Sequence, residues 1–250
     1  MKNLFLILAI SFIATTPAQC QWWGSNETVR GNGDMTSEKR NTADYDEISL
    51  VGSMDVQLVS GTEGNLIVEA ESNLQEYITT EVNGGTLKIS VEKGYNLKPS
   101  RNNDIKVTVP FKDLSAVEVT GSGDVWNTSK INAKKFSTKV TGSGDIKLEL
   151  EVEDLSGQVT GSGDILLSGT ARDFDCKVTG SGDFKAYDLR AENVEATVMG
   201  SGDIQISANS SLKAKVMGSG DIKYKGNPKN QDFKTSGSGS VSSHQSLPKK

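Results

Sequence analysis

The tetrapeptide Gly-Ser-Gly-Asp recurs through the second half of the chain, and this repeat restricts the possible folds more than any other feature. The copies, of which the last reads Gly-Ser-Gly-Ser, begin at Gly121, Gly142, Gly161, Gly180, Gly200, Gly218 and Gly237. Successive copies are 18 to 21 residues apart, and no proline falls between them before Pro228. A period held this closely indicates one structural unit that is repeated along the chain.

Within one unit, apolar and polar residues alternate. Phe136, Val140 and Ile146 are separated by even numbers of residues, whereas Lys139 and Asp145 fall on the other side of the same pattern. A period of two is that of a β-strand with one buried face and one face in water, and no unit follows the 3.6-residue period of a helix. We therefore expect the repeats to be built from strands.

The same apolar residue types return at the same place in every unit. Stacked coils produce this pattern, because each side chain then lies over its counterpart about 4.8 Å away in the next coil. An antiparallel meander would need a tight turn signal between strands, and its strands would have no reason to share one motif. The sequence predicts an all-β chain whose repeats form a parallel β-helix, or solenoid, of about 19–20 residues per coil. The predicted columns are Val119, Val140, Val159, Val178, Val198 and Val216 before the motif, and Val125, Ile146, Ile165, Phe184, Ile204, Ile222 and Val241 after it.

The glycines of the motif are expected to form a corner. About thirteen extended residues would run about 40 Å, which is longer than ordinary strands, so each unit has to bend. Glycine adopts backbone angles that other residues avoid and lets the chain approach its neighbour closely. The alternative, a phosphate-binding loop, needs a single strand-to-helix turn, whereas here the motif recurs without helices.

The motif aspartates form a column of like charges, which needs compensation because opposed like charges destabilise a sheet. In one explanation, each carboxylate accepts hydrogen bonds from backbone amides at the corner, aided by Lys147, Lys185 and Lys223. In the other, the column is a row of calcium sites, although the known calcium-binding solenoid repeat has a different period and places its aspartate elsewhere. We expect no cofactor, with calcium as the open alternative. The candidate calcium ligands are Asp124, Asp145, Asp164, Asp183, Asp203 and Asp221.

The first twenty residues have the layout of a secretory signal. Lys2 precedes an apolar run over residues 4–14 that is too short to span a bilayer, and small and polar residues follow. Cleavage after Ala18 or Cys20 is expected. Acylation of Cys20, which would anchor the chain to a membrane, is the alternative, although Gln19 does not suit it. No later segment is apolar enough to cross a membrane, so we predict an exported protein in the periplasm, on the outer surface or in the medium.

The charge of the exported chain argues against a nucleic-acid partner. Removal of Lys2 changes the net charge from −5 to −6, whereas nucleic-acid binders usually present a basic face. After cleavage behind Cys20, Cys176 is the one remaining cysteine, so no disulfide framework is expected.

The region before the regular repeats also reads as β-structure. Asn83–Gly85 has the composition of a hairpin turn, and Gly52–Val56, with the sequence GSMDV, is a degenerate copy of the motif. We expect this region to cap or flank the solenoid, whose first coil would otherwise expose its pairing groups. The expected segments are a signal peptide (1–20), a lead segment (21–44), an irregular β-rich cap (45–116), the regular β-helix (117–242) and a polar tail (243–250).

The motif copies, together with "WWGSNETVRGNG", "YDEISLVGSMDVQLVSG" and "VTVPFKDLSAVEVTGSGDV", resemble the bacterial family called putative auto-transporter adhesin, head GIN domain. The resemblance covers about residues 28 to 242 and rests on the motifs as a set. It implies a right-handed single-stranded β-helix in exported proteins, without an established biochemical activity. The adhesin part of the name implies a function only by analogy of shape.

Residues for catalysis are missing from the repeats. Polysaccharide lyases and hydrolases also use β-helices, but His244, the one histidine, falls in the tail, and Arg101, Arg172 and Arg190 belong to irregular stretches. The motif aspartates are a feature of the repeat and not a selected pair for acid–base work. We expect no enzyme, and a polysaccharide-processing β-helix enzyme is the least favoured alternative.

Two sets of outward-facing apolar residues are candidates for a binding surface. Met199 and Met217 interrupt a column of threonines, and Trp126 shares another outward column with Leu166. Contiguous apolar surface often marks a contact site, although the N-terminal segment or the tail could cover these residues instead. We expect a non-catalytic envelope or cell-surface protein that binds a glycan or a protein of the envelope or host. The alternative is a periplasmic structural protein without a dedicated ligand.

Overall fold

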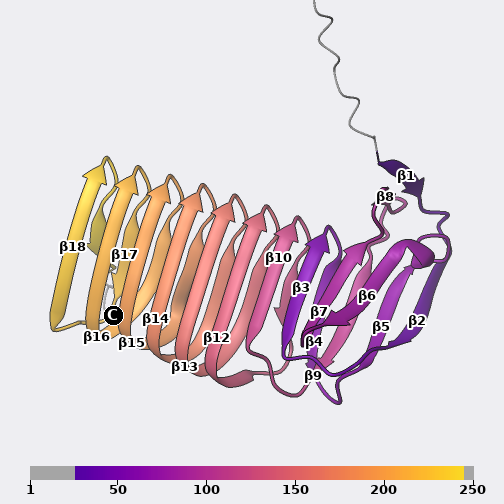
Figure 1. Cartoon of the computed structure of the whole chain (residues 1–250). Coiled ribbons are helices and arrows are strands. Elements are labelled where there is room, and N and C mark those ends of the chain that lie inside the picture. The colour runs from indigo at the N-terminus through magenta and orange to yellow at the C-terminus, as the bar shows by residue number, and fades with distance from the viewer. Residues whose placement is uncertain (1–25, 245–250) are drawn as a thin grey trace, which may run out of the picture.

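The computed structural model describes residues 26–244 and has the form of an elongated stack of β-coils (Figure 1). The one helix in this part of the chain is a short 3-10 turn, η1 (Gln75–Tyr77). The strands of the N-terminal part are β1 (Glu27–Arg30), β2 (Met35–Asn41), β3 (Glu47–Gly52), β4 (Asp55–Ser60), β5 (Asn65–Glu71), β6 (Ile78–Asn83), β7 (Thr86–Val91), β8 (Tyr95–Lys98) and β9 (Lys106–Phe111). The strands of the repeats are β10 (Ala116–Gly121), β11 (Val125–Asn127), β12 (Ile131–Gly142), β13 (Ile146–Gly161), β14 (Ile165–Gly180), β15 (Phe184–Gly200), β16 (Ile204–Gly218), β17 (Ile222–Lys225), β18 (Asn230–Gly237) and β19 (Val241–Ser243).

Consecutive coils pair in parallel, in a register that aligns one motif with the next. Gly161 at the end of β13 lies opposite Gly142 of β12 and Gly180 of β14. The alignment continues to the last coil, where Gly218 of β16 lies opposite Gly237 of β18. The predicted all-β parallel solenoid is therefore confirmed.

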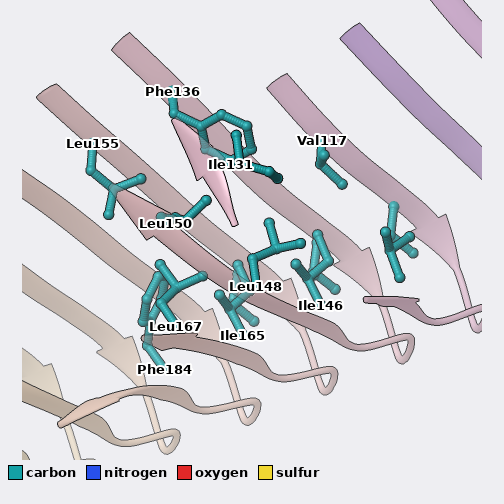
Figure 2. Close-up of a cluster of buried hydrophobic side chains, with 14 of the residues drawn as sticks. Val117, Ile131, Phe136, Ile146, Leu148, Leu150, Leu155, Ile165, Leu167 and Phe184 are labelled. Carbon is teal, nitrogen blue, oxygen red and sulfur yellow. The ribbon is translucent and has the colours of Figure 1, made fainter. Parts of the chain in front are cut away.

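The two predicted apolar columns lie inside the stack, except that Val241 of the last coil is half-buried. Figure 2 shows Ile146, Ile165 and Phe184 of the column after the motif. Ile146 and Ile165 pair across β13 and β14, and Phe184 continues this column in β15. Val140 and Val159 belong to the second column and are also buried. Full burial of side chains of this kind contributes about 1.5–3 kcal/mol each, so the columns supply most of the driving force for stacking.

The motif glycines turn the chain at one edge of every coil, as predicted. The first glycine of each copy has φ between 124° and 143°, where other residues are strained. The second glycine approaches the preceding coil, and a Cβ atom on Gly163 would lie 2.0 Å from the carbonyl oxygen of Gly144. At the same corner, the carbonyl oxygen of Gly142 accepts hydrogen bonds from the N–H groups of Ser162 (2.8 Å) and Gly163 (3.0 Å).

Each coil also bends at a second place, which no common sequence motif marks. β13 is 16 residues long, and its pairing with both neighbouring strands skips Glu153. The residues aligned just after this bend are polar but do not keep one type through all coils. Asp154 lies opposite Asp173, and Asp173 lies opposite Asn193. The strand continues through the bend without a loop, and a polar edge runs along the stack.

The degenerate copy at Gly52–Val56 forms the first coil of the solenoid. β3 and β4 pair in parallel with β10 and β11, so that Gly52 lies opposite Gly121 and Val56 lies opposite Val125. Strand pairing thus joins two motif copies that are 69 residues apart in the chain. The segment expected to be irregular, 45–116, therefore contains a regular coil.

The strands between these two coils form a cap over the end of the stack (Figure 1). β7 and β9 extend the first coil in parallel, whereas β5, β6 and β2 add to them in antiparallel order. The predicted hairpin at Asn83–Gly85 is confirmed, because β6 pairs with β7 around two glycines of positive φ, Gly84 (60°) and Gly85 (84°). β2 lies within the segment expected as a lead, 21–44, and is part of the cap.

A buried carboxylate holds the cap together. Glu71 at the end of β5 is 1% exposed and accepts hydrogen bonds from the N–H groups of Gly33 and Ser100 and from the amide of Asn103. Burial raises the pKa of Glu71, but these hydrogen bonds outweigh it and leave the pKa below its ordinary value. The carboxylate therefore joins three separate segments of the cap.

The C-terminal strand ends later than the expected tail boundary. Ser243 belongs to β19, the N–H group of His244 donates to the carbonyl oxygen of Tyr224 (2.7 Å), and the His244 ring stacks on Tyr187. β19 therefore extends to the first residue of the segment expected as a polar tail, 243–250, and His244 is bonded to β17. The expected signal segment, with Cys20, and the final six residues lie outside the described part of the chain.

Candidate functional site

The motif aspartates form a hydrogen-bonded ladder along one corner of the stack. Oδ1 of Asp145 accepts the backbone N–H of Asp164 (2.8 Å), and the N–H of Asp145 donates to Oδ1 of Asp124 (2.9 Å). The same bond recurs from Asp183 onward to Asp221, which accepts both the N–H and the hydroxyl of Ser240. The explanation by backbone amides is thus correct, with one change: each carboxylate serves the next coil and not its own turn.

Lysines neutralise part of this ladder. Lys185 forms ion pairs with Asp164 and Asp183, and its hydrogen bond to Asp164 raises the pKa of Lys185 despite partial burial. Lys223 lies 3.7 Å from Asp203 and 3.8 Å from Asp221. Lys147, in contrast, forms no ion pair among residues 26–244.

The geometry of the ladder bears on the calcium alternative. One oxygen of each carboxylate is occupied by an amide of the next coil, and residues 26–244 contain no cluster of three or more His, Cys, Asp or Glu side chains arranged to hold a metal. Each carboxylate therefore keeps at most one oxygen for an ion, and the second oxygen of Asp164 is bonded by Lys185. Calcium takes six to eight oxygens, so backbone carbonyls, hydroxyls or water would have to supply the rest.

Trp126 and Leu166 lie in one outward column, as expected, but they are not neighbours. Lys147 pairs with Trp126 on one side and with Leu166 on the other. Leu166 is 39% exposed and Trp126 is half-buried. Together with Lys185 and the acidic corner they line a hollow of about 380 Å³, so the apolar surface there is divided by an ammonium group.

Met199 and Met217 are direct neighbours on adjacent strands, as the sequence indicates. Both are half-buried and line a hollow of about 480 Å³. Lys177, Lys215 and Asp232 also line this hollow. The methionine pair therefore forms a small apolar spot within a charged surface.

A larger hollow than these two is a groove along the second bend, which sequence reasoning missed. It has a volume of about 770 Å³ and takes its lining from β10 and β12 through β16. Its floor is a continuous column of buried apolar residues, Phe136, Leu155, Phe174 and Val194. Because the lining comes from successive coils, the groove runs along the solenoid axis and crosses the strands.

The walls of the groove carry more acidic than basic side chains. The carboxylates are those of Glu47, Asp154, Asp173, Asp175 and Glu195, and the two ammonium groups are those of Lys135 and Lys213.

Neighbouring charges divide these carboxylates into two kinds. The Arg172 guanidinium bonds Asp173 (2.9 Å) and Asp154 (2.8 Å), and together with Asn193 it lowers the pKa of Asp173. Partial burial and the nearby Glu195 raise the pKa of Asp175, which has no ion pair among the described residues. Lys177 and Lys213 offset this rise in part, although neither forms an ion pair with Asp175. Asp175 is therefore an unpaired carboxylate in the groove among the described residues.

The axial groove is lined by carboxylates, lysines, serines and apolar side chains. No histidine, cysteine or tyrosine lines the axial groove, and His244 lies against Tyr187 elsewhere on the stack. Cys176 is fully buried, and burial raises the pKa of its thiol well above the ordinary value.

The stack of parallel coils defines this chain as a β-solenoid. Residues 44–228 match the family described as "Putative auto-transporter adhesin, head GIN domain", and the chain belongs to that family. The resemblance found in the sequence is thereby confirmed.

Solved structures of similar fold carry related descriptions. A putative adhesin from Bacteroides fragilis NCTC 9343 is 26% identical with a TM-score of 0.81, and the match covers 86% of this chain and 100% of that one. A putative lipid binding protein from Parabacteroides distasonis ATCC 8503 is 31% identical with a TM-score of 0.73, covering 88% and 100%. A putative adhesin from Parabacteroides merdae ATCC 43184, at 23% identity and a TM-score of 0.69, shares the fold. None of the curated proteins compared with the chain matches it.

No helix within residues 26–244 has the length and apolar character needed to cross a membrane.

Proposed function

We propose that this chain is a non-catalytic binding protein of the cell envelope or cell surface, and that its ligand lies along the axial groove. The observation that carries this proposal is the groove itself, with its apolar floor and its polar walls drawn from successive coils. A ligand that follows the solenoid axis would contact the same kinds of groups in every coil. Many weak contacts of this kind suit an extended polymer better than a compact small molecule.

The charges of the walls favour a protein ligand with basic side chains over an acidic glycan. Carboxylates outnumber ammonium groups on the walls, and Asp175 forms no ion pair among the described residues, although Lys177 and Lys213 attract it from a distance. The floor residue Phe174 is only 3% exposed, so it supplies apolar contact without an open ring face on which a sugar could stack. An extended segment with alternating basic and apolar residues fits both features.

A lipid ligand is the second candidate, because the relative at 31% identity is described as a putative lipid binding protein. The apolar floor would support an acyl chain, whereas the acidic walls would repel anionic headgroups. If the ligand is a lipid, the acidic walls of the groove therefore favour a zwitterionic headgroup.

Direct binding measurements on the purified chain test the proposal. The probes are an extended peptide of alternating lysine and leucine, a matched peptide of glutamate and leucine, a glycan array, and vesicles of zwitterionic or anionic lipid. We expect binding of the basic peptide that weakens as salt is added, because the attraction is electrostatic.

The variant Asp175→Lys places a cation in the groove and should weaken binding of the basic peptide by roughly tenfold. Glu118→Lys makes the same change of charge on an exposed residue of β10 that does not line the groove, and it should leave binding unchanged. Equal effects of the two variants, or binding of none of the probes, would contradict the proposal. Strong binding to vesicles alone would favour the lipid candidate.

The location is tested separately on intact cells. We expect external protease to remove the protein while periplasmic markers stay intact. If the protein is protected together with those markers and the purified chain binds none of the probes, the periplasmic structural role takes the place of the adhesin role.

A further inference from the structure

The two ends of the solenoid are finished differently. At one end, the antiparallel strands of the cap cover the first coil. At the other end, β16 is the only strand that pairs with β18 among residues 26–244, and every residue of β18 is exposed. Figure 1 shows β18 as the outermost strand of the stack. An open edge of eight residues, without a proline, invites pairing with another strand.

The free hydrogen-bonding groups of this edge can be assigned. The N–H of Ser238 donates to the carbonyl oxygen of Gly218 (2.9 Å), which fixes the side of the strand that serves β16. Because alternate residues of a strand direct their groups to the same side, Asp232 and Lys234 also bond to β16. The N–H and C=O groups of Phe233 and of its neighbours two residues away therefore point to the open edge.

The side chains of the last coil are also incomplete without a neighbour. Phe233 lies in register with the buried Ala214, which places its ring at a core position, and it packs against Tyr224 with ring centroids 5.7 Å apart. With no coil beyond it, Phe233 is 38% exposed. A strand added to this edge would bury the ring.

We propose that a second copy of this chain occupies the edge, with the two β18 strands antiparallel around a two-fold axis at Phe233. This register places Asp232 opposite Lys234 of the second copy, and Lys234 opposite Asp232 of the second copy. In this register the free N–H and C=O groups of Phe233 bond to those of Phe233 in the second copy. The free N–H and C=O groups of Gln231 bond to those of Thr235 in the second copy. The antiparallel pairing then supplies about six backbone hydrogen bonds and two cross-strand ion pairs.

Charge selects this register over its neighbours. A two-fold axis at Asp232 would place that carboxylate opposite itself, and an axis at Lys234 would place two ammonium groups together. Opposed like charges destabilise a sheet, whereas opposite charges in the same positions stabilise it. The sequence Asp-Phe-Lys is therefore self-complementary only when Phe233 is at the centre.

The assembly closes at two copies. An isologous contact uses the same surface on both partners, so one pairing uses up the β18 edges of both copies, and the caps lie at the far ends. The contact between the two β18 strands uses neither the groove nor its ligand, so it is independent of the proposed binding function.

Sedimentation of the full purified chain over a range of micromolar concentrations tests this inference. We expect a monomer–dimer equilibrium without higher species. Asp232→Lys and Lys234→Asp should each weaken dimerisation by roughly tenfold, because each replaces two attractive pairs by two repulsive ones. A mixture of the two variants should regain the dimer, since each lysine of one copy then faces an aspartate of the other.

Two further measurements keep the test decisive. Thermal unfolding of each variant at low concentration checks that the exposed substitutions leave the fold intact. The variant Glu118→Lys changes an exposed charge of β10, away from the edge, and should dimerise as the parent does. A chain that is monomeric throughout, a dimer insensitive to both charge variants, or a mixture that fails to recover would each overturn the proposal.

Discussion

The second glycine of each motif is fixed by its distance to the preceding coil. A methyl group on Gly163 would overlap the carbonyl oxygen of Gly144. That oxygen belongs to backbone that hydrogen bonds between successive coils hold in place. Ser162, one residue earlier, is exposed. The two adjacent residues face opposite sides of the wall, since Gly163 faces the stack and Ser162 faces water.

Gly163→Ala should therefore lower the free energy of unfolding by about 2–4 kcal/mol, as overpacking at a rigid site does. Ser162→Ala is the matched control and should change it by less than about 0.5 kcal/mol. Urea unfolding of both variants followed by circular dichroism provides the comparison. Equal stability of the two would show that the corner does not depend on close approach.

Glu71 gives the cap a dependence on pH. Its pKa in the folded chain is below the ordinary value, so its contribution to stability is complete at neutral pH, above the pKa of the unfolded chain of about 4.3. The contribution is lost as pH falls through the folded pKa, because the protonated carboxyl accepts these hydrogen bonds poorly.

The difference in unfolding midpoint between the parent and Glu71→Gln should be largest near pH 7 and should shrink below about pH 4. At pH 7 we expect Glu71→Gln to cost about 1–3 kcal/mol, since three donors lose a charged acceptor. Glu69→Gln removes an exposed carboxylate, 3.4 Å from Lys106, and should have little effect at any pH. A pH-independent difference for Glu71→Gln would contradict the assignment.

At the scale of a strand, alternate side chains belong to two environments. Ile165 is 0% exposed inside the stack, whereas Leu166 beside it is 39% exposed and lies between Lys147 and Lys185. Ile165→Asp would bury a carboxylate with no partner and should cost several kcal/mol. Leu166→Asp would place the same group between two lysines and should cost less than about 1 kcal/mol. Thermal unfolding of both variants checks the register, and similar midpoints would mean that it is wrong.

The aspartate ladder depends on an acceptor oxygen and not on the charge that surrounds it. Asp145→Asn keeps an oxygen for the N–H of Asp164 and should retain most of the stability. Asp145→Ala leaves that N–H without its acceptor and should cost about 1 kcal/mol or more. Melting curves of the two variants, with and without calcium, separate the two explanations. Calcium would be favoured if it raised the melting temperature of the parent chain but not that of either variant.

The strands were predictable from sequence because neighbouring coils are related by translation. When every coil repeats the same contacts, the column of valines before the motif is both a sequence pattern and a structural one, and Val140 and Val159 lie opposite each other as expected. The bend at Glu153 escaped prediction, since the aligned polar residues there do not repeat one type through all coils and the strand passes through without a turn signal. The contact between Gly52 and Gly121 was hidden by the 69 residues between them.

The candidate site was less predictable than the fold for a related reason. Trp126, Leu166 and the methionine pair attract notice as large apolar residues on outward positions, and the structure places them as half-buried or divided by lysine. The axial groove arises where successive coils bend, so its shape depends on the backbone path. The one sequence signal that could have found it is the unbroken column from Phe136 to Val194.

Across the whole molecule, stability should fall toward the open end. Each coil in the middle is paired on both sides, whereas β18 has one partner in the described chain. Hydrogen exchange of the Asp232→Lys variant, which we expect to be monomeric, should show strong protection from β12 to β15 and the fastest exchange in β18. Within β18, the amide of Phe233 should exchange faster than that of Lys234. Uniform protection along the stack would contradict this gradient.

The one-directional bonds of the aspartate ladder make the length of this protein adjustable in whole steps. The carboxylate of each coil accepts the backbone N–H of the next coil, so the ladder bond is the same at every junction between coils. Excision of the 19 residues from Lys147 to Ile165 would join Ile146 to Leu166, with Ile146 taking the place of Ile165 beneath Phe184. The cap and the terminal strand would keep their own contacts and would simply stand about 4.8 Å closer together. The number of coils thus sets the distance between the two ends of the solenoid. This distance can be changed without a change in the sequence of either end.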